Sequence, residues 1–359
     1  MSRVLKHCSY LAVCLIFILN SCTSRTNGEG KKIVTNPNAM DKEVAGQIES
    51  TLNKLADNSG KVNDSMSLNM QQIVSEFYNK NDHQPVWSST EKWLPLADSL
   101  YLFIKNAENE GLFPSDYHFS NLKILKDTLD KDSVARMNAN LWTRADLLLT
   151  DGFMHIIKDL KQGRLQPDSL SLNKDSVLVD KFFIASLNKL IEKKDLNGLF
   201  VSLQPKHKKY WELKKGIKRF VDSMDRRVFT HVTYPFKRGD EKDSLYFIKT
   251  LQKRLAENNC ISAGKKMPDS TELSAALKKY QAQKGLKADG KYGREIISSL
   301  NSNDAERFKR IAITLDRYKQ LPEKMPEKYI WVNLPGYYLE LVDADTVVFE
   351  SKVICGKPE

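Results

Sequence analysis

Cysteine and histidine are the side chains of this sequence best suited to nucleophilic or metal chemistry, and both types are few. Five cysteines and six histidines occur in 359 residues. They are adjacent only at His7-Cys8, and no Cys/His group has metal-ligand spacing, so we expect neither a metal site nor a cofactor. Cys260 and Cys355 lie about 95 residues apart and no spacing rule pairs them, which favours two independent thiols.

Asp151 and His155 are the remaining pair whose spacing could carry acid/base chemistry. They lie one helical turn apart, where a carboxylate and an imidazole can meet. An ordinary pair on a helix surface explains the same spacing, and we favour that interpretation.

The N-terminus has the pattern of an export signal. Arg3 and Lys6 precede an apolar run of about ten residues, which is too short to span a bilayer and typical of a signal peptide. The run ends in Leu19-Asn20-Ser21-Cys22, which resembles a bacterial lipobox. This resemblance implies that residues 1–21 are a lipoprotein signal peptide and that the Cys22 thiol receives a lipid anchoring the protein to a membrane. The alternative is an ordinary signal peptide in which Cys22 is incidental.

Polar sequence follows to about Asn69. We expect residues 22–69 to form a flexible tether with one short helix, over residues 43–55. No acidic run follows Cys22, and by resemblance to lipoprotein sorting signals this favours an outer-membrane lipoprotein that faces the periplasm. The formal charge of +11 suits an anionic polymer or a membrane surface, or simply solubility, and export makes nucleic acid an improbable partner.

Residues 70–240 read as a helical domain, because apolar side chains recur at helical spacing. One long stripe contains Leu141, Ala145, Leu148, Leu149, Ile156 and Leu160, and another contains Tyr210, Leu213, Ile217, Phe220, Val221 and Met224. We expect Trp87 and Tyr117 to be core anchors. The helix with the second stripe also carries clustered positive charge, either a solvated face or a surface for anionic polymer. Its basic residues are Lys206, Lys208, Lys209, Lys214, Lys215, Lys218, Arg219, Arg226 and Arg227.

A second module is predicted over residues 244–302, with three helices. Ser270 can cap its second helix, which ends at Lys284-Gly285. The stretch from Ala276 to Gly290 resembles the peptidoglycan-binding-like repeat, a small three-helix module. The resemblance implies a ligand site near five residues: Tyr280, Gln281, Asp289, Gly290 and Tyr292. A structural spacer that binds nothing is the alternative.

Residues 303–359 are predicted to form a helix followed by three strands with alternating polarity. A turn at Asp343-Ala344-Asp345 joins the last two strands. Three strands with an open edge seldom form a domain alone, so we expect the beginning of a larger β domain whose remainder is missing.

Several sequence segments in the helical domain and the tail are similar to segments of scaffold-containing L,D-transpeptidases, which are periplasmic enzymes that crosslink peptidoglycan. They are Phe77–Trp87, Ala107–Tyr117, Leu149–Met154, Asp159–Pro167 and, in the tail, Asp316–Pro358. The resemblance implies a mainly α fold: a helical scaffold, the peptidoglycan-binding-like module, and the first β-strands of a truncated all-β (YkuD-type) L,D-transpeptidase domain.

In that family a cysteine thiolate, activated by a histidine, transfers an acyl group between peptide stems. These residues belong to a Ser-His-Gly-Cys-type stretch that this sequence lacks, so no catalytic residue can be assigned. We therefore expect a lipid-anchored L,D-transpeptidase that is incomplete and inactive as given, so its status as an enzyme is left open. The alternative is a non-enzymatic peptidoglycan-associated lipoprotein.

Overall fold

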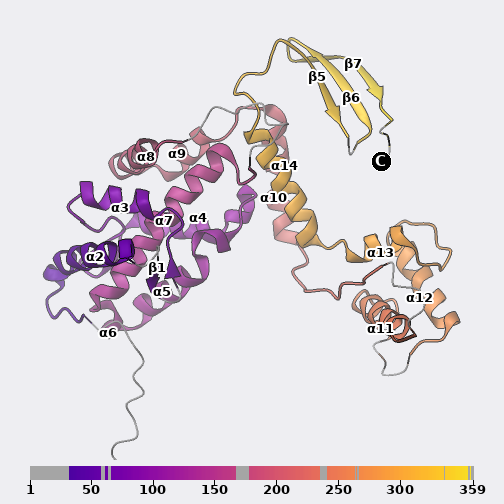
Figure 1. Ribbon diagram of the computed structural model, residues 1–359, viewed down its shortest axis with the longest axis horizontal. Coiled ribbons are helices and arrows are strands. Elements are labelled where there is room, and N and C mark those ends of the chain that lie inside the picture. The colour runs from indigo at the N-terminus through magenta and orange to yellow at the C-terminus, as the bar shows by residue number, and fades with distance from the viewer. Residues whose placement is uncertain are drawn as a thin grey trace, which may run out of the picture. The chain divides into compact units, whose positions relative to one another are not determined.

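The computed structural model describes residues 32–57, 61–63, 66–166, 178–234, 241–262, 264, 267–334, 336–354 and 356. Helices predominate in these ranges, and the longest strands form one sheet near the end of the chain (Figure 1), which confirms the mainly α prediction. The chain divides into two compact units. The first contains Met1–Tyr101, Tyr117–Met154 and Leu187–Lys194, and the second contains Leu102–Asp116, His155–Ser186 and Asp195–Glu359.

The elements of the first unit are short strands and helices. They are η1 (Pro37–Ala39), α2 (Met40–Asp57), β1 (Lys61–Asn63), β2 (Met66–Ser67), α3 (Gln71–Lys80), β3 (Ser88–Ser89), β4 (Lys92–Trp93), α5 (Phe119–Lys131) and α6 (Ser133–Arg136). Four of the described helices contribute residues to both units: α4 (Pro95–Lys105), η3 (Pro114–Tyr117), α7 (Ala139–Gln162) and α8 (Asp180–Lys193). The second unit adds η2 (Ala107–Glu110), α9 (Leu196–Leu203), α10 (Lys208–Ser223), α11 (Glu241–Glu257), α12 (Ser270–Gln283), α13 (Arg294–Asn301), α14 (Asp304–Lys319), β5 (Lys328–Asn333), β6 (Tyr338–Asp343) and β7 (Thr346–Lys352).

Helix α7 supplies the centre of the first unit. Every residue from Ala145 to Met154 is buried, so this part of the helix is enclosed on all sides and not only along the predicted stripe. The predicted anchors Trp87 and Tyr117 are fully buried, as expected. The Trp87 indole donates to Thr150 Oγ1 at 2.8 Å, which satisfies the polar edge of a large buried ring.

Helix α2 contains the short helix predicted over residues 43–55, but its packing corrects the tether prediction for residues 40–57. Its side chains Val44, Ile48, Leu52 and Leu55 are at most 5% exposed, and Asp41 accepts hydrogen bonds from the Ser89 hydroxyl and the Thr90 amide. The four apolar residues recur at helical spacing, and burying them stabilises the unit by about 1.5–3 kcal/mol each. The helix is therefore part of the folded unit.

In the second unit, α10 and α14 share a core built on Tyr210, Ile217, Phe308 and Leu315. Gly111 ends η2 in the left-handed conformation, with φ of +72°. A Cβ atom at this position would lie 2.5 Å from Leu315 Cδ1, so only glycine allows this approach.

A buried cluster of charged residues connects two of the segments that resemble L,D-transpeptidases, Asp159–Pro167 and Asp316–Pro358. The Lys319 ammonium donates to the Asp159 carbonyl at 2.9 Å and pairs with Asp316 at 3.0 Å. The side chains of Asp316 and Lys319 are fully buried, and the Arg164 guanidinium lies 3.4 Å from the Asp316 carboxylate. Because removing one partner would leave an uncompensated buried charge, the cluster fixes α14 against the segment after α7.

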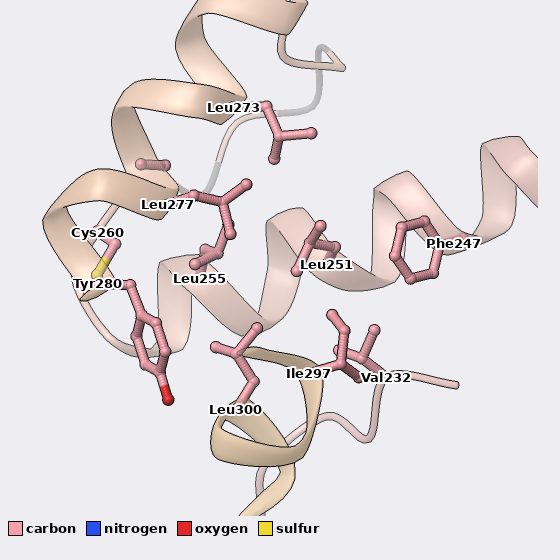
Figure 2. Packing of buried hydrophobic residues seen from close by; sticks show 11 residues of the cluster. Val232, Phe247, Leu251, Leu255, Cys260, Leu273, Leu277, Tyr280, Ile297 and Leu300 are labelled. Carbon is pink, nitrogen blue, oxygen red and sulfur yellow. The ribbon is translucent and has the colours of Figure 1, made fainter. Parts of the chain in front are cut away.

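Helices α11, α12 and α13 form a three-helix module with its own core. Figure 2 shows Phe247, Leu251 and Leu255 of α11 facing residues of α12 and α13. Val232, which the predicted boundary at residue 240 places in the helical domain, is fully buried in this core. The Asn301 amide holds it there, because Asn301 Oδ1 accepts from the Val232 N–H at 2.9 Å and Nδ2 donates to its carbonyl at 2.8 Å.

Strands β5, β6 and β7 form an antiparallel meander in that order, as the alternating pattern predicted. Ile330, Leu341 and Phe349 are paired across the three strands, so apolar side chains share one face of the sheet. Ile330 and Phe349 are more than half exposed.

Candidate functional site

A hollow of about 680 Å³ lies on the three-helix module, along α12 and the turn that follows it. Its volume is within the range of small-molecule sites. Aliphatic side chains of Ile248, Leu273 and Leu277 line its more buried part, and Leu273 and Leu277 are at most 8% exposed. Ser274 and Tyr292 are among the more exposed lining residues.

The local sequence positions α12 by caps at both ends. Asp269 accepts from the Thr271 and Glu272 amides at 2.8 Å each, and the Glu272 carboxylate accepts from the Asp269 N–H at 3.0 Å. This capping box makes Asp269, not the predicted Ser270, the N-cap, because the carboxylate reaches both free amides. The helix ends at Lys284-Gly285 as predicted, with Gly285 at φ of +66°.

Gln281 fixes the turn that forms one wall of the hollow. Its side chain is almost fully buried, donates to Asp289 Oδ1 at 2.8 Å and to the Lys291 carbonyl at 3.1 Å, and accepts from the Gly290 N–H at 2.8 Å. Asp289 also accepts from the Lys291 N–H at 2.9 Å. The Lys291 amide, followed by Gln281, holds the pKa of the Asp289 carboxyl below its usual value.

Gly290 brings this turn against α12. Its φ of +71° lies in the left-handed region, and a Cβ atom would lie 2.3 Å from Ser274 Oγ and 2.9 Å from the Ser274 carbonyl. A side chain is therefore excluded both by the backbone conformation and by the close approach. The turn from Asp289 to Tyr292 depends on glycine at this position.

The five residues predicted near a ligand have different surroundings. Tyr280 is 1% exposed and its hydroxyl shares a hydrogen bond with Ser299 at 2.9 Å, so it lies in the module core with Gln281. Gly290 and Tyr292 line the hollow, and Asp289 joins the turn beside it. The Tyr292 ring packs against Phe247, with ring centroids 5.2 Å apart. A role in binding stays a prediction for all five residues.

Sequence reasoning missed the hollow's Ser274, Lys291 and the aliphatic residues around Leu273. The apolar residues were recognisable as one face of α12, but a stripe of this kind predicts a core and not a cavity. Ser274 carried no signal of its own, since its place in the site depends on the approach of Gly290.

A second hollow, of about 970 Å³, is bordered by the beginning of α10 and by the sheet. Tyr318 and Trp331 stack in it with centroids 6.0 Å apart, and Lys209 pairs with Glu340 at 2.7 Å. Lys206 likewise pairs with Glu323. Several of its charged side chains thus neutralise one another.

The clustered positive charge on and next to α10 is mostly matched inside the protein. Seven of the nine basic side chains between Lys206 and Arg227 form salt bridges, which favours the interpretation as an ordinary face. Lys214 is not solvated: its side chain is 10% exposed and pairs with Glu110, and burial lowers its pKa.

Asp151 and His155 do not act as a couple. Asp151 is fully buried, and its carboxylate bonds His118 Nε2 at 2.6 Å and accepts from the Met70 amide at 2.7 Å. The His155 ring is directed to the Asp116 carbonyl at 3.2 Å and Asp159 at 3.5 Å. The pair is structural, but it is not on the surface as we had expected.

The described residues contain no group of His, Cys, Asp and Glu that could hold a metal ion. No helix within the described part of the chain has the length and apolar character needed to cross a membrane. Cys260 is a buried free thiol whose pKa burial raises. Cys22 and Cys355 lie outside the described residues.

Two protein families match the chain. Residues 72–217 match the Scaffold domain, and residues 246–300 match the Putative peptidoglycan binding domain. No curated protein matches the chain. The two matched domains fit the architecture associated with L,D-transpeptidases. The second match supports peptidoglycan as a partner and suggests association with the cell wall. Neither match extends into residues 303–359.

Proposed function

We propose that this protein associates with the bacterial cell wall by binding peptidoglycan through its three-helix module. The observation that carries the proposal is that the matched module has an open hollow, with one wall formed by a turn that Gln281 and Gly290 fix. A structural spacer needs a core but no cavity of this size. A preformed hollow with a few polar groups at its edge is the general form of a ligand site.

Sedimentation of the full chain with purified sacculi tests this proposal. We expect wild-type protein to sediment with the sacculi and Lys291→Glu to sediment less, because Lys291 lines the hollow. Lys284→Glu is the matched control: it makes the same charge change at the other end of α12. If wild-type protein stays in the supernatant, the module is a spacer.

We also propose that the protein serves peptidoglycan crosslinking of the L,D-transpeptidase type. The support is the order of scaffold, peptidoglycan-binding module and antiparallel meander, which is the order of the resembling enzymes. No residue of the chain is assigned to a catalytic step.

Deleting the gene and analysing the muropeptides separates this proposal from a purely docking role. Loss of the crosslinks that L,D-transpeptidases form supports the enzyme proposal. Unchanged crosslinks, together with sacculus binding, identify a non-enzymatic peptidoglycan-associated protein.

We further propose that the mature protein is anchored through lipid on Cys22 and faces the periplasm from the outer membrane. The support is the lipobox-like Leu19-Asn20-Ser21-Cys22 after a short apolar run. Mass spectrometry of the mature N-terminus tests the anchor, with Cys22→Ser as the control. Membrane fractionation tests the location, and an unmodified Cys22 would contradict the anchor.

A further inference from the structure

The hollow on the three-helix module has a distinct chemical character. Its more buried lining is aliphatic, from Ile248, Leu273 and Leu277, with Met267 and Pro268 also along it. Tyr292 is the aromatic side chain among the lining residues, and its ring already packs against Phe247. A sugar ring placed on this aliphatic surface would bury hydroxyl groups without partners, which is costly.

The module that carries the hollow has a positive net charge, and the charged residues that line the hollow are Asp269 and Lys291. Residues 246–300 contain eleven Lys and Arg and five Asp and Glu, so their formal charge of +6 is more than half of the chain's +11. Lys291 lines the hollow, and the Lys278 side chain lies beside Gly290, with its Cε 3.0 Å from where a Cβ atom of residue 290 would be. Neither lysine forms a salt bridge with a described residue.

The neighbouring carboxylates are already engaged. Asp269 accepts from the first amides of α12, and Asp289 accepts from Gln281 and from the Lys291 amide. Both carboxylates keep their charge but direct oxygens to the cap and the turn, and neither forms a salt bridge with Lys278 or Lys291. The Ser274 hydroxyl also lines the hollow and adds a hydrogen-bonding group.

We propose that the hollow receives the peptide stem of peptidoglycan, entering with its terminal carboxylate, and not the glycan strand. This inference rests on the proposed function. The small methyl side chains of a terminal alanine match the aliphatic lining, and the carboxylate pairs with Lys291 at the rim. Charge complementarity and the apolar lining favour the same occupant.

Calorimetric titration of the full chain with three synthetic probes tests the proposal. The probes are a stem tetrapeptide ending in D-alanine, the same peptide with a C-terminal amide, and a neutral N-acetylglucosamine tetramer. We expect the tetrapeptide to bind most tightly. Amidation of the peptide or the Lys291→Glu substitution should each weaken binding by about two- to fivefold, as for an exposed charge pair that is lost.

The decisive readout is the coupling between the two changes. Lys291→Glu should weaken binding of the amidated peptide much less than binding of the free acid, because the amidated peptide lacks the terminal carboxylate that Lys291 would contact. Lys284→Glu should leave both affinities unchanged, and circular dichroism should confirm that both variants are folded. Equal losses for acid and amide, or preference for the sugar tetramer, would overturn the inference. Binding to sacculi would still support the proposed function in that case, whereas failure to bind sacculi would remove both.

Discussion

Asp146 provides a sharp test of how the helical unit is held together. This residue of α7 is 1% exposed, and its carboxylate accepts from the Tyr78 hydroxyl at 2.6 Å, the Val86 amide at 2.9 Å and the Trp87 amide at 3.0 Å. Burial nevertheless dominates these hydrogen bonds and raises the pKa of Asp146 to about 6. We predict that Asp146→Asn changes the pH dependence of stability in a defined direction.

The sign follows from proton linkage. With a pKa of about 6 when folded, against a usual value of 3.8, Asp146 binds a proton more readily in the folded state. Its contribution to the free energy of unfolding is therefore full below pH 4 and is lost as the pH rises through 6. One pH unit inside this window corresponds to about 1.4 kcal/mol. The wild type should therefore gain about 1.4 kcal/mol over Asp146→Asn between pH 7 and pH 5.

Urea unfolding at pH 7 and pH 5 measures this difference. Hydrogen exchange of a peptide that contains Val86 and Trp87 serves as the probe, because it reports on unfolding of the first compact unit. Thr150→Val is the control, because it removes the hydroxyl that bonds Tyr78 and Trp87 without removing a carboxyl group. Its cost of about 1–2 kcal/mol should be the same at both pH values. A difference between wild type and Asp146→Asn that is constant, or that shrinks at pH 5, would refute the reasoning.

Three further predictions concern the three-helix module. Gly290→Ala should destabilise the module by about 2–4 kcal/mol, because the new Cβ atom would meet Ser274 and the backbone φ is positive. Gly285→Ala also has a positive φ, but its Cβ atom would meet nothing within 4 Å, so it should cost only about 1–2 kcal/mol. Thermal unfolding of the two variants measures the difference. Gln281→Ala should release the turn and weaken sedimentation with sacculi while circular dichroism shows the helices retained, and undiminished binding would show that the turn is not part of the site. Cys260 should react slowly with a thiol reagent at pH 8 and rapidly in denaturant, because burial raises its pKa, and equal rates would contradict its placement in the core.

Periodic apolar residues made most of the helices predictable. The stripe on α10 forms the shared core with α14, and Trp87 and Tyr117 are buried as their size suggested. Residues 40–57 were predicted only in part. A short helix was expected over residues 43–55, and α2 contains it, but the polar composition suggested a tether, so the burial of Val44 and Ile48 in the folded unit was not predicted.

Polar residues were harder to place, because their roles depend on partners far away in the sequence. Asp316 and Lys319 look like an exposed pair three residues apart, yet both are buried because the Asp159 carbonyl completes the cluster. Gln281 lies in a stretch that resembles a binding motif, and the sequence alone cannot show that it holds the turn and not a ligand. Contacts of this kind are set by tertiary packing, which local patterns do not encode.

The distribution of positive charge bears on where the protein meets the wall. The basic residues on and next to α10 were the most conspicuous run in the sequence. Most of them pair with acidic groups of the same unit, so little of their positive field is left for a ligand. The three-helix module has a net charge of +6, and beside its hollow lie Lys278 and Lys291, which form no salt bridge with any residue that the structure describes. Attraction to an anionic wall should therefore act on the module more than on α10. The hollow and its lysines thus lie together at the turn that Gln281 holds. This turn is therefore where we expect the module that matches a peptidoglycan-binding domain to contact the wall.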